Sequence, residues 1–352
     1  MATTLAPTPT PQHEALTGGT LPTWSTPVVL VAAIAAAVGL NLTTGLAGWF
    51  GTSIVAGLIF LVIQSSWSFA VEGRRHAVDR LATTLVYSTF IAAIVPLVSV
   101  IVTVLARGLK VMDLAFLTHS MRNVSPRMPG GGAGHAIVGT LEQVAIAAAF
   151  AIPVGILAAV FLVEYGRGRL SRAISFFVDV MTGIPSIVSG LFVFTAFVLG
   201  LGLERSGMAA AISLAILMLP VIIRTTEEML RIVPNDLREA SYALGVPKWR
   251  TILKVVLPTS IAGIVTGAML AIARVAGETA PLLLTTFLTQ SYNHNPFTGP
   301  QASLPTFIWD QITSGTPASV DRAWAGALVL ITIIMLFYIT AKLLAMRFAP
   351  KG

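Results

Sequence analysis

The chain has 352 residues, of which 55% are hydrophobic and 11% are charged. A soluble domain carries about a quarter of charged residues, so this composition indicates an integral membrane protein. The apolar runs are about 20 residues long and do not alternate with a period of two, which predicts membrane-spanning helices rather than a β-barrel. The net charge of +7 is spread over many loops and is no nucleic-acid signal, and the absence of cysteine excludes disulfides and thiolate metal sites.

The N-terminal part of the chain is expected to form a tail and a helical hairpin. Residues 1–27 are rich in Thr and Pro and hold no Lys or Arg, which predicts a disordered tail. Residues 28–72 hold two apolar runs joined by a short polar turn and are expected to form a transmembrane hairpin. The first basic residues follow at Arg74 and Arg75, which predicts that the end of the hairpin and the tail are cytoplasmic.

Residues 73–352 are expected to form a second domain with six further spans. The eight expected spans are 28–48, 52–70, 82–105, 137–163, a fifth that starts near 174, 208–223, 258–287 and 323–345. The segments 107–135 and 289–321 are expected to be external loops, the second with an aromatic patch at Phe307 and Trp309. With both termini inside, 15 of the 22 Lys and Arg residues fall in cytoplasmic segments, an asymmetry typical of membrane proteins.

A helix break is expected inside the fifth span. Gly183, Pro185 and Gly190 interrupt an apolar run there. The hydroxyls of Ser186 and Ser189 are expected either to satisfy freed backbone groups or to face a pathway, and packing is the preferred interpretation.

The longest polar interval with helical character is 234–258. Asn235 or Asp236 predicts a capped helix start, and Gly245 predicts its end, because glycine is favoured in the left-handed position after a helix. Pro247 suits the first turn of a second helix, which is expected to stop where the interval ends. A short basic helix–turn–helix between two spans is typical of a docking surface for a cytoplasmic partner.

This interval resembles the EAA loop of ABC-importer permeases, whose two short helices dock into an ATP-hydrolysing subunit. The residues that carry the resemblance, at the family's spacing, are Glu239, Ala240, Ser241, Gly245, Leu257 and Pro258. Ser241 stands where the family has a second alanine, a change that keeps the position small. The resemblance implies that these residues couple the spans to the ATPase.

Charged residues in the spans are candidates for a substrate path. Arg274 and Glu278 lie four residues apart in the seventh span, which predicts one helix face and a possible ion pair. The pair is either structural or lines an anion path, since an arginine near the bilayer centre should face protein or water. Arg224, where the sixth span meets the cytoplasm, is either an anchor or a gate residue. Glu142 and Asp179, near span ends, are assigned no role.

Four further stretches extend the resemblance over residues 75–348. They are Gly183 to Leu191, Arg224 to Met229, Tyr242 to Gly245 and Gly277 to Leu283. Together with the EAA loop they resemble PstA-type permeases of phosphate importers. This implies an all-α type I ABC-importer core of six transmembrane helices, to which the N-terminal hairpin adds two. It also implies a bacterial inner membrane, a PstC-type permease as heterodimer partner, a PstB-type ATPase dimer and an external PstS-type phosphate-binding protein.

No P-loop and no motif for chemistry on a substrate occurs, so no ATP site, catalytic residue, metal or cofactor is expected in this chain. The nearest alternative is an ABC permease for sulfate, molybdate or another oxyanion, because one arginine does not distinguish tetrahedral anions. A channel or secondary transporter that works without an ATPase is the second alternative, and the docking loop argues against it.

Overall fold

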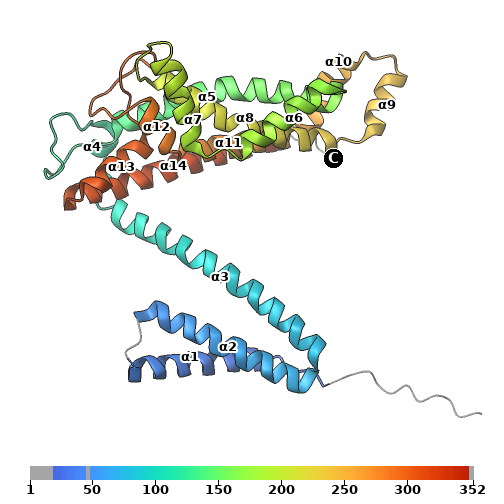
Figure 1. Ribbon diagram of the computed structural model, residues 1–352, viewed down its shortest axis with the longest axis vertical. Coiled ribbons are helices and arrows are strands. Elements are labelled where there is room, and N and C mark those ends of the chain that lie inside the picture. The colour runs from blue at the N-terminus through green and yellow to red at the C-terminus, as the bar shows by residue number, and fades with distance from the viewer. Residues whose placement is uncertain (1–18, 45–47, 349–352) are drawn as a thin grey trace, which may run out of the picture. The chain divides into compact units, whose positions relative to one another are not determined.

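The computed structural model describes residues 19–44 and 48–348, and every regular element in these ranges is a helix. The chain divides into two compact units, Met1–Ile101 and Val102–Gly352, which are described separately (Figure 1). Seven helices in the described ranges are long and apolar enough to cross a membrane, and a bent helix pair makes an eighth if it is counted as one span. The tail expected for 1–27 lies outside the described residues as far as residue 18.

The first unit is built on the expected hairpin. Helices α1 (Ser25–Thr44) and α2 (Gly48–Glu72) lie side by side (Figure 1). The rings of Trp24, just before α1, and Trp67 of α2 meet edge to face at 6.3 Å. Helix α3 (Arg74–Gly108) begins in this unit and ends in the second one.

Glu72 organises the corner between α2 and α3. Its carboxylate, only 3% exposed, accepts hydrogen bonds from the backbone N of Leu21 at 2.6 Å and from Ser68 at 2.7 Å, and it pairs with Arg80 at 2.7 Å. Gly73 has a φ of +83°, which only glycine adopts readily, and it lets the chain turn between the two helices. The corner is therefore fixed by a buried carboxylate as well as by the turn.

The second unit packs around α8 (Gly207–Ile232), which lies between α5 (Gly134–Val160) and α11 (Leu257–Ala276) (Figure 1). Small residues let these helices approach closely, as is common in membranes. A Cβ added to Gly155 of α5 would lie 2.6 Å from the Ile222 side chain of α8. The buried core of the unit consists of Val144, Ala147, Ala151, Ala210, Ala211, Leu214, Met218, Ile222, Ala271, Val275, Ala276 and Leu282.

The expected fifth span is divided into two helices. Helix α6 (Arg169–Thr182) meets α7 (Ser186–Val193), which continues as the π-helical turn η2 (Phe194–Leu199), at an angle of 109°. The break lies at Gly183 to Pro185, so the sequence-based prediction of a break is confirmed. Ser189 is buried and donates to the carbonyl of Ser213 on α8 at 2.8 Å, which confirms the packing interpretation for this hydroxyl.

The expected seventh span is also broken. Helix α11 ends at Ala276, and a separate short helix, α12 (Ala280–Thr285), follows after three residues. Helix α12 packs against α7, so the two interrupted stretches support each other.

The two segments predicted to be external loops are partly helical and packed. Helix α4 (Leu114–Thr118) lies in the first, and α13 (Leu304–Ser314) in the second, where Ser303 and Thr306 form a capping box. Phe307 is 1% exposed and packs on Phe116, so only Trp309 of the expected aromatic patch is exposed. The prediction of plain loops was wrong because it gave no weight to the apolar residues that these segments bury.

Arg322 joins these two segments. It lies in the first turns of α14 (Pro317–Phe348) and is only 1% exposed, although the sequence places it in an external loop. Its guanidinium donates to the carbonyls of Pro126, Met128 and Gly130 at 2.7 to 3.2 Å and to Gln311 of α13 at 2.8 Å. The side chain satisfies loop carbonyls that no helix or strand pairs.

Candidate coupling loop and buried charges

The polar interval forms two short helices, as its pattern predicts. Helix α9 (Asn235–Ala243) follows Pro234, which occupies the N-cap position, so neither Asn235 nor Asp236 caps the helix. The cap prediction was wrong by one residue, because Pro234 already has the extended backbone of a cap. Gly245 has a φ of +75° and ends the helix as predicted.

The second helix does not stop at the end of the interval. Helix α10 (Lys248–Thr251) continues through the π-helical turn η3 (Ile252–Val256) directly into α11. Leu257 and Pro258 are the first two residues of α11 and follow this turn directly. The second half of the loop is therefore one continuous rod with a membrane span.

The motif residues of the loop divide into an outer and an inner set. Glu239 and Ala240 are exposed, and Leu244 beside them is 83% exposed. Ser241 is buried, and its hydroxyl lies 2.8 Å from that of Thr251 on α10. Ser241 therefore holds the two helices together. The side chains of Glu239, Ala240 and Leu244 are left without a partner within the described part of the chain.

Two residues that fasten the loop were missed by the sequence-based prediction. Arg238 on α9 pairs with Glu164 at 3.1 Å, and their side chains are 12% and 5% exposed. Glu164 lies in the π-helical turn η1 (Phe161–Tyr165), which prolongs α5. A signal was present in the sequence, because Arg238 is three residues before Ser241 and shares its helix face.

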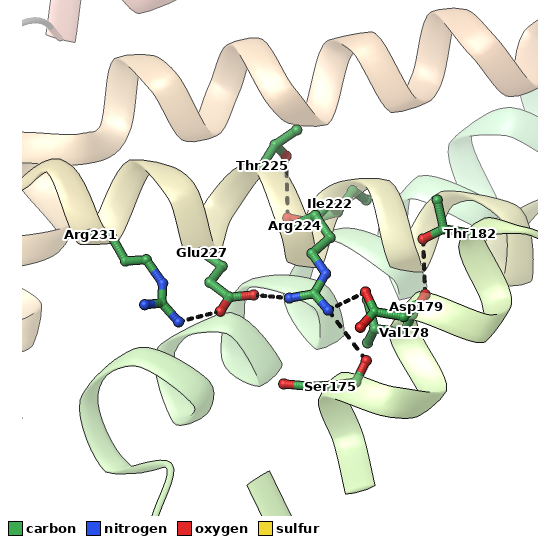
Figure 2. Close-up of polar contacts among 9 residues, drawn as sticks. All are labelled: Ser175, Val178, Asp179, Thr182, Ile222, Arg224, Thr225, Glu227 and Arg231. Atoms are coloured by element: carbon green, nitrogen blue, oxygen red, sulfur yellow. Dashed lines mark hydrogen bonds and ion pairs between the residues drawn. The ribbon is translucent and has the colours of Figure 1, made fainter. Parts of the chain in front are cut away.

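Arg224 is the centre of a charged cluster between α6 and α8, shown in Figure 2. Its guanidinium pairs with Asp179 of α6 and, at 2.6 Å, with Glu227 one turn further along α8. Glu227, 7% exposed, also pairs with Arg231 at 2.7 Å. Asp179, to which the sequence gave no role, thus links α6 to α8.

Arg274 and Glu278 do not form the ion pair that their spacing predicts. The helix ends at Ala276, and the chain turns at Gly277, so the two residues are not on one continuous helix face. Arg274 is exposed and Glu278 half-buried, and neither side chain has a hydrogen bond or ion pair among the described residues. The glycine breaks the helical repeat on which the pairing prediction depended.

Helix α12, just after Glu278, is held in place by α7. Gly190 of α7 lies against Pro281 of α12, and the hydroxyl of Thr285 donates to the carbonyl of Pro281 at 2.8 Å. Among the described residues no group of three or more His, Asp or Glu side chains could hold a metal ion. The exposed guanidinium of Arg274 can offer positive charge to an anion.

Known proteins resemble this chain in sequence and in fold. The family model "Binding-protein-dependent transport system inner membrane component" matches residues 151–350. The "Phosphate transport system permease protein PstA 1" of Mycobacterium tuberculosis (strain CDC 1551 / Oshkosh) is 47% identical over 272 residues, which cover 77% of this chain and 90% of that protein. The "Phosphate transport system permease protein PstA" of Yersinia pestis is 40% identical over 278 residues, 79% of this chain and 92% of that protein.

The fold recurs in a solved transporter. A chain of a bacterial alginate ABC transporter, in complex with an alginate pentasaccharide-bound periplasmic protein, superposes with a TM-score of 0.55. The match covers 78% of this chain and 96% of that chain, at 15% sequence identity, and is a likeness of fold alone.

Proposed function

Because the chain belongs to the binding-protein-dependent transport system inner membrane components, and among them to the PstA-type phosphate permeases, we propose that it is the permease subunit of an ATP-driven phosphate importer. It spans the membrane several times and forms the translocation path together with a second permease. A separate cytoplasmic ATPase supplies the energy, since the chain has no P-loop of its own.

The observation that carries the coupling proposal is the outward face of the loop. Leu237, Leu244 and Trp249 are 42%, 83% and 54% exposed, so the two short helices leave three large apolar side chains exposed. Such a surface is typical of a protein interface. We propose that it docks into a PstB-type ATPase dimer, and that Glu239 and the helix up to Gly245 transmit closure of that dimer to the spans.

The charged residues have different proposed roles. Arg274 has no partner within the described part of the chain, which supports a role in the anion path, where it offers positive potential without binding phosphate tightly. Glu278, at the break after α11, is proposed to tune that potential. Arg224 already pairs with two carboxylates, one on α6 and one on α8. This supports a role as a latch: the residue holds α6 against α8 and gates the cytoplasmic end of the path.

We propose further that residues 73–352 are the permease domain and that residues 28–72 are an N-terminal extension without an assigned role. The distribution of Lys and Arg supports cytoplasmic termini in a bacterial inner membrane. The proposed partners are a PstC-type permease, the ATPase dimer and an external PstS-type phosphate-binding protein. Sulfate or molybdate is the alternative cargo, and the relatives named as phosphate permeases favour phosphate.

The experiment that tests this function is uptake of labelled phosphate in cells that lack their own high-affinity importer. The cells express the chain with its candidate PstC-type, ATPase and binding-protein partners, and each partner is omitted in turn. We expect uptake only with the full set, competition by arsenate but not by sulfate, and loss of uptake in Glu239→Lys. Uptake without the ATPase would refute the ABC assignment, and a complex that hydrolyses ATP but ignores phosphate would change the cargo.

A further inference from the structure

One buried ion pair fastens the coupling loop to the end of α5. The Nη2 and Nε atoms of Arg238 each lie 3.1 Å from Oε1 of Glu164. The two side chains are 12% and 5% exposed, so solvent screens this pair far less than an ordinary surface pair. The contact is therefore a firm link between α9 and η1.

The same guanidinium also holds the end of α8. Its Nη1 donates to the carbonyl of Val233 at 2.5 Å, and its Nη2 donates to the carbonyl of Leu230 at 2.9 Å. These carbonyls belong to the end of α8, where the backbone lacks helical partners. Arg238 thus joins the loop to the cytoplasmic ends of two spans at once.

The second helix of the loop is attached at the same point. Lys248 on α10 donates to the backbone carbonyl of Glu164, and its Nζ lies 4.8 Å from the ring centroid of Tyr165. The hydrogen bond between Ser241 and Thr251 ties α10 to α9. Both helices are therefore expected to move with Glu164 as one body.

From these contacts we propose that Arg238 is a positioning residue that transmits displacement of the coupling loop, through Glu164, into α5 and α8. This proposal rests on the proposed function and names the residues that carry the coupling. Beyond Glu164 the path is the packed core, in which α5 and α8 enclose Ala271 and Val275 of α11. These residues precede and follow Arg274, so a force on α9 reaches the candidate anion path through packed helices as well as along the chain.

The test uses the assembled transporter in proteoliposomes, with labelled-phosphate uptake and ATP hydrolysis measured on the same preparation. In Arg238→Gln we expect ATP hydrolysis to continue while phosphate imported per ATP falls about tenfold, within the range of ordinary coupling between sites. Glu164→Gln should show the same defect more weakly, since its amide oxygen can still accept a hydrogen bond. In Arg238→Lys, phosphate imported per ATP should lie between the values of Arg238→Gln and the wild type. Lysine keeps the charge but lacks the planar set of donors of the guanidinium.

Arg167→Gln is the matched control. Arg167 lines the same cavity of about 440 Å³ as Arg238, it is exposed, and it has no hydrogen bond or ion pair among the described residues. We expect its ratio of uptake to hydrolysis to equal that of the wild type. The proposal is overturned if Arg238→Gln keeps this ratio, or if its uptake and hydrolysis fall in equal proportion.

A cross-linking experiment separates transmission from folding. The chain has no cysteine, so Arg238→Cys combined with Glu164→Cys introduces its only two thiols. The partner subunits are cysteine-free, and a short bismaleimide joins the two thiols. Phosphate imported per ATP should then be several-fold higher than in the same sample before cross-linking. Complete cross-linking without a rise would overturn the proposal. A wild-type complex without ATP-dependent phosphate uptake would instead refute the proposed function itself.

Discussion

Gly190 of α7 touches Pro281 of α12 backbone to backbone. A Cβ added to Gly190 would lie 2.5 Å from the Cα of Pro281, closer than real side chains allow. Helix α12 follows the break beside Glu278, so this contact fixes where the chain emerges from the candidate anion path. Helices α7 and α12 can therefore approach each other this closely because Gly190 has no Cβ methyl group.

Gly190→Ala is therefore expected to destabilise the protein by about 1–3 kcal/mol, the usual cost of overpacking a filled contact. Thermal unfolding in detergent measures this. Gly183→Ala is the matched control, because a Cβ there would meet only the Val180 carbonyl, at an ordinary 3.6 Å. Equal unfolding temperatures for the two variants would contradict the contact.

Arg274→Gln is expected to fold normally and to transport poorly. No described residue pairs with the guanidinium, so its loss removes no native contact. Phosphate uptake should fall by about ten- to a hundredfold, since a hydrogen bond to a charged group contributes about 1.5–3 kcal/mol. Arg274→Lys should recover part of the uptake, because it keeps the charge. Unchanged uptake in the Gln variant would remove Arg274 from the path.

Arg322→Met is expected to destabilise the protein, whereas Arg274→Gln is expected to fold normally. The change removes the hydrogen bonds that the buried guanidinium donates to the carbonyls of Pro126, Met128 and Gly130, and a hydrogen bond to a charged group contributes about 1.5–3 kcal/mol. The expected result is a lower unfolding temperature and faster proteolysis between residues 119 and 133. Arg127→Gln, at an exposed site without a partner in the described ranges, should stay within about 0.5 kcal/mol of wild type. Resistance of the Met variant to protease would contradict the role of Arg322.

The cluster around Arg224 should respond unequally to loss of its two acids. Glu227 is 7% exposed and holds two arginines, so Glu227→Ala should destabilise the protein by about 1–3 kcal/mol. Asp179 is 66% exposed, and Asp179→Ala should cost less than about 1 kcal/mol because solvent screens the pair. Chemical denaturation of the purified chain measures both. A larger effect at Asp179 would show that the latch between α6 and α8 dominates.

Much of the fold follows from composition and local signals. Long apolar runs predict the spans, and Gly245 and Gly183 to Pro185 predict where helices end. These signals are local, because a glycine or proline changes the backbone wherever it stands. The ends that failed, such as the stop expected at Leu257-Pro258, failed because proline is also compatible with the first turn of a helix.

The candidate site was only partly predictable because its contacts are long-range. Glu164 and Arg238 are 74 residues apart, so the shared helix face of Arg238 and Ser241 indicates an inward position but does not indicate the partner. Arg322 was expected outside the spans because it lies between the segment 289–321 and the span 323–345, whereas its burial depends on carbonyls almost 200 residues away. The pairing of Arg274 with Glu278 was expected from helical spacing, which Gly277 interrupts.

The π-helical turn η3 joins helix α10 to α11, and its residues are spaced more widely than those of an α-helix. An α-helix turns about 100° per residue, so one extra residue rotates everything beyond it by that angle. Turn η3 therefore sets the direction in which α10 and its exposed Trp249 point relative to α11. Deleting one residue from η3 would leave the span long enough to cross the membrane and would turn α10 by about 100° relative to α11.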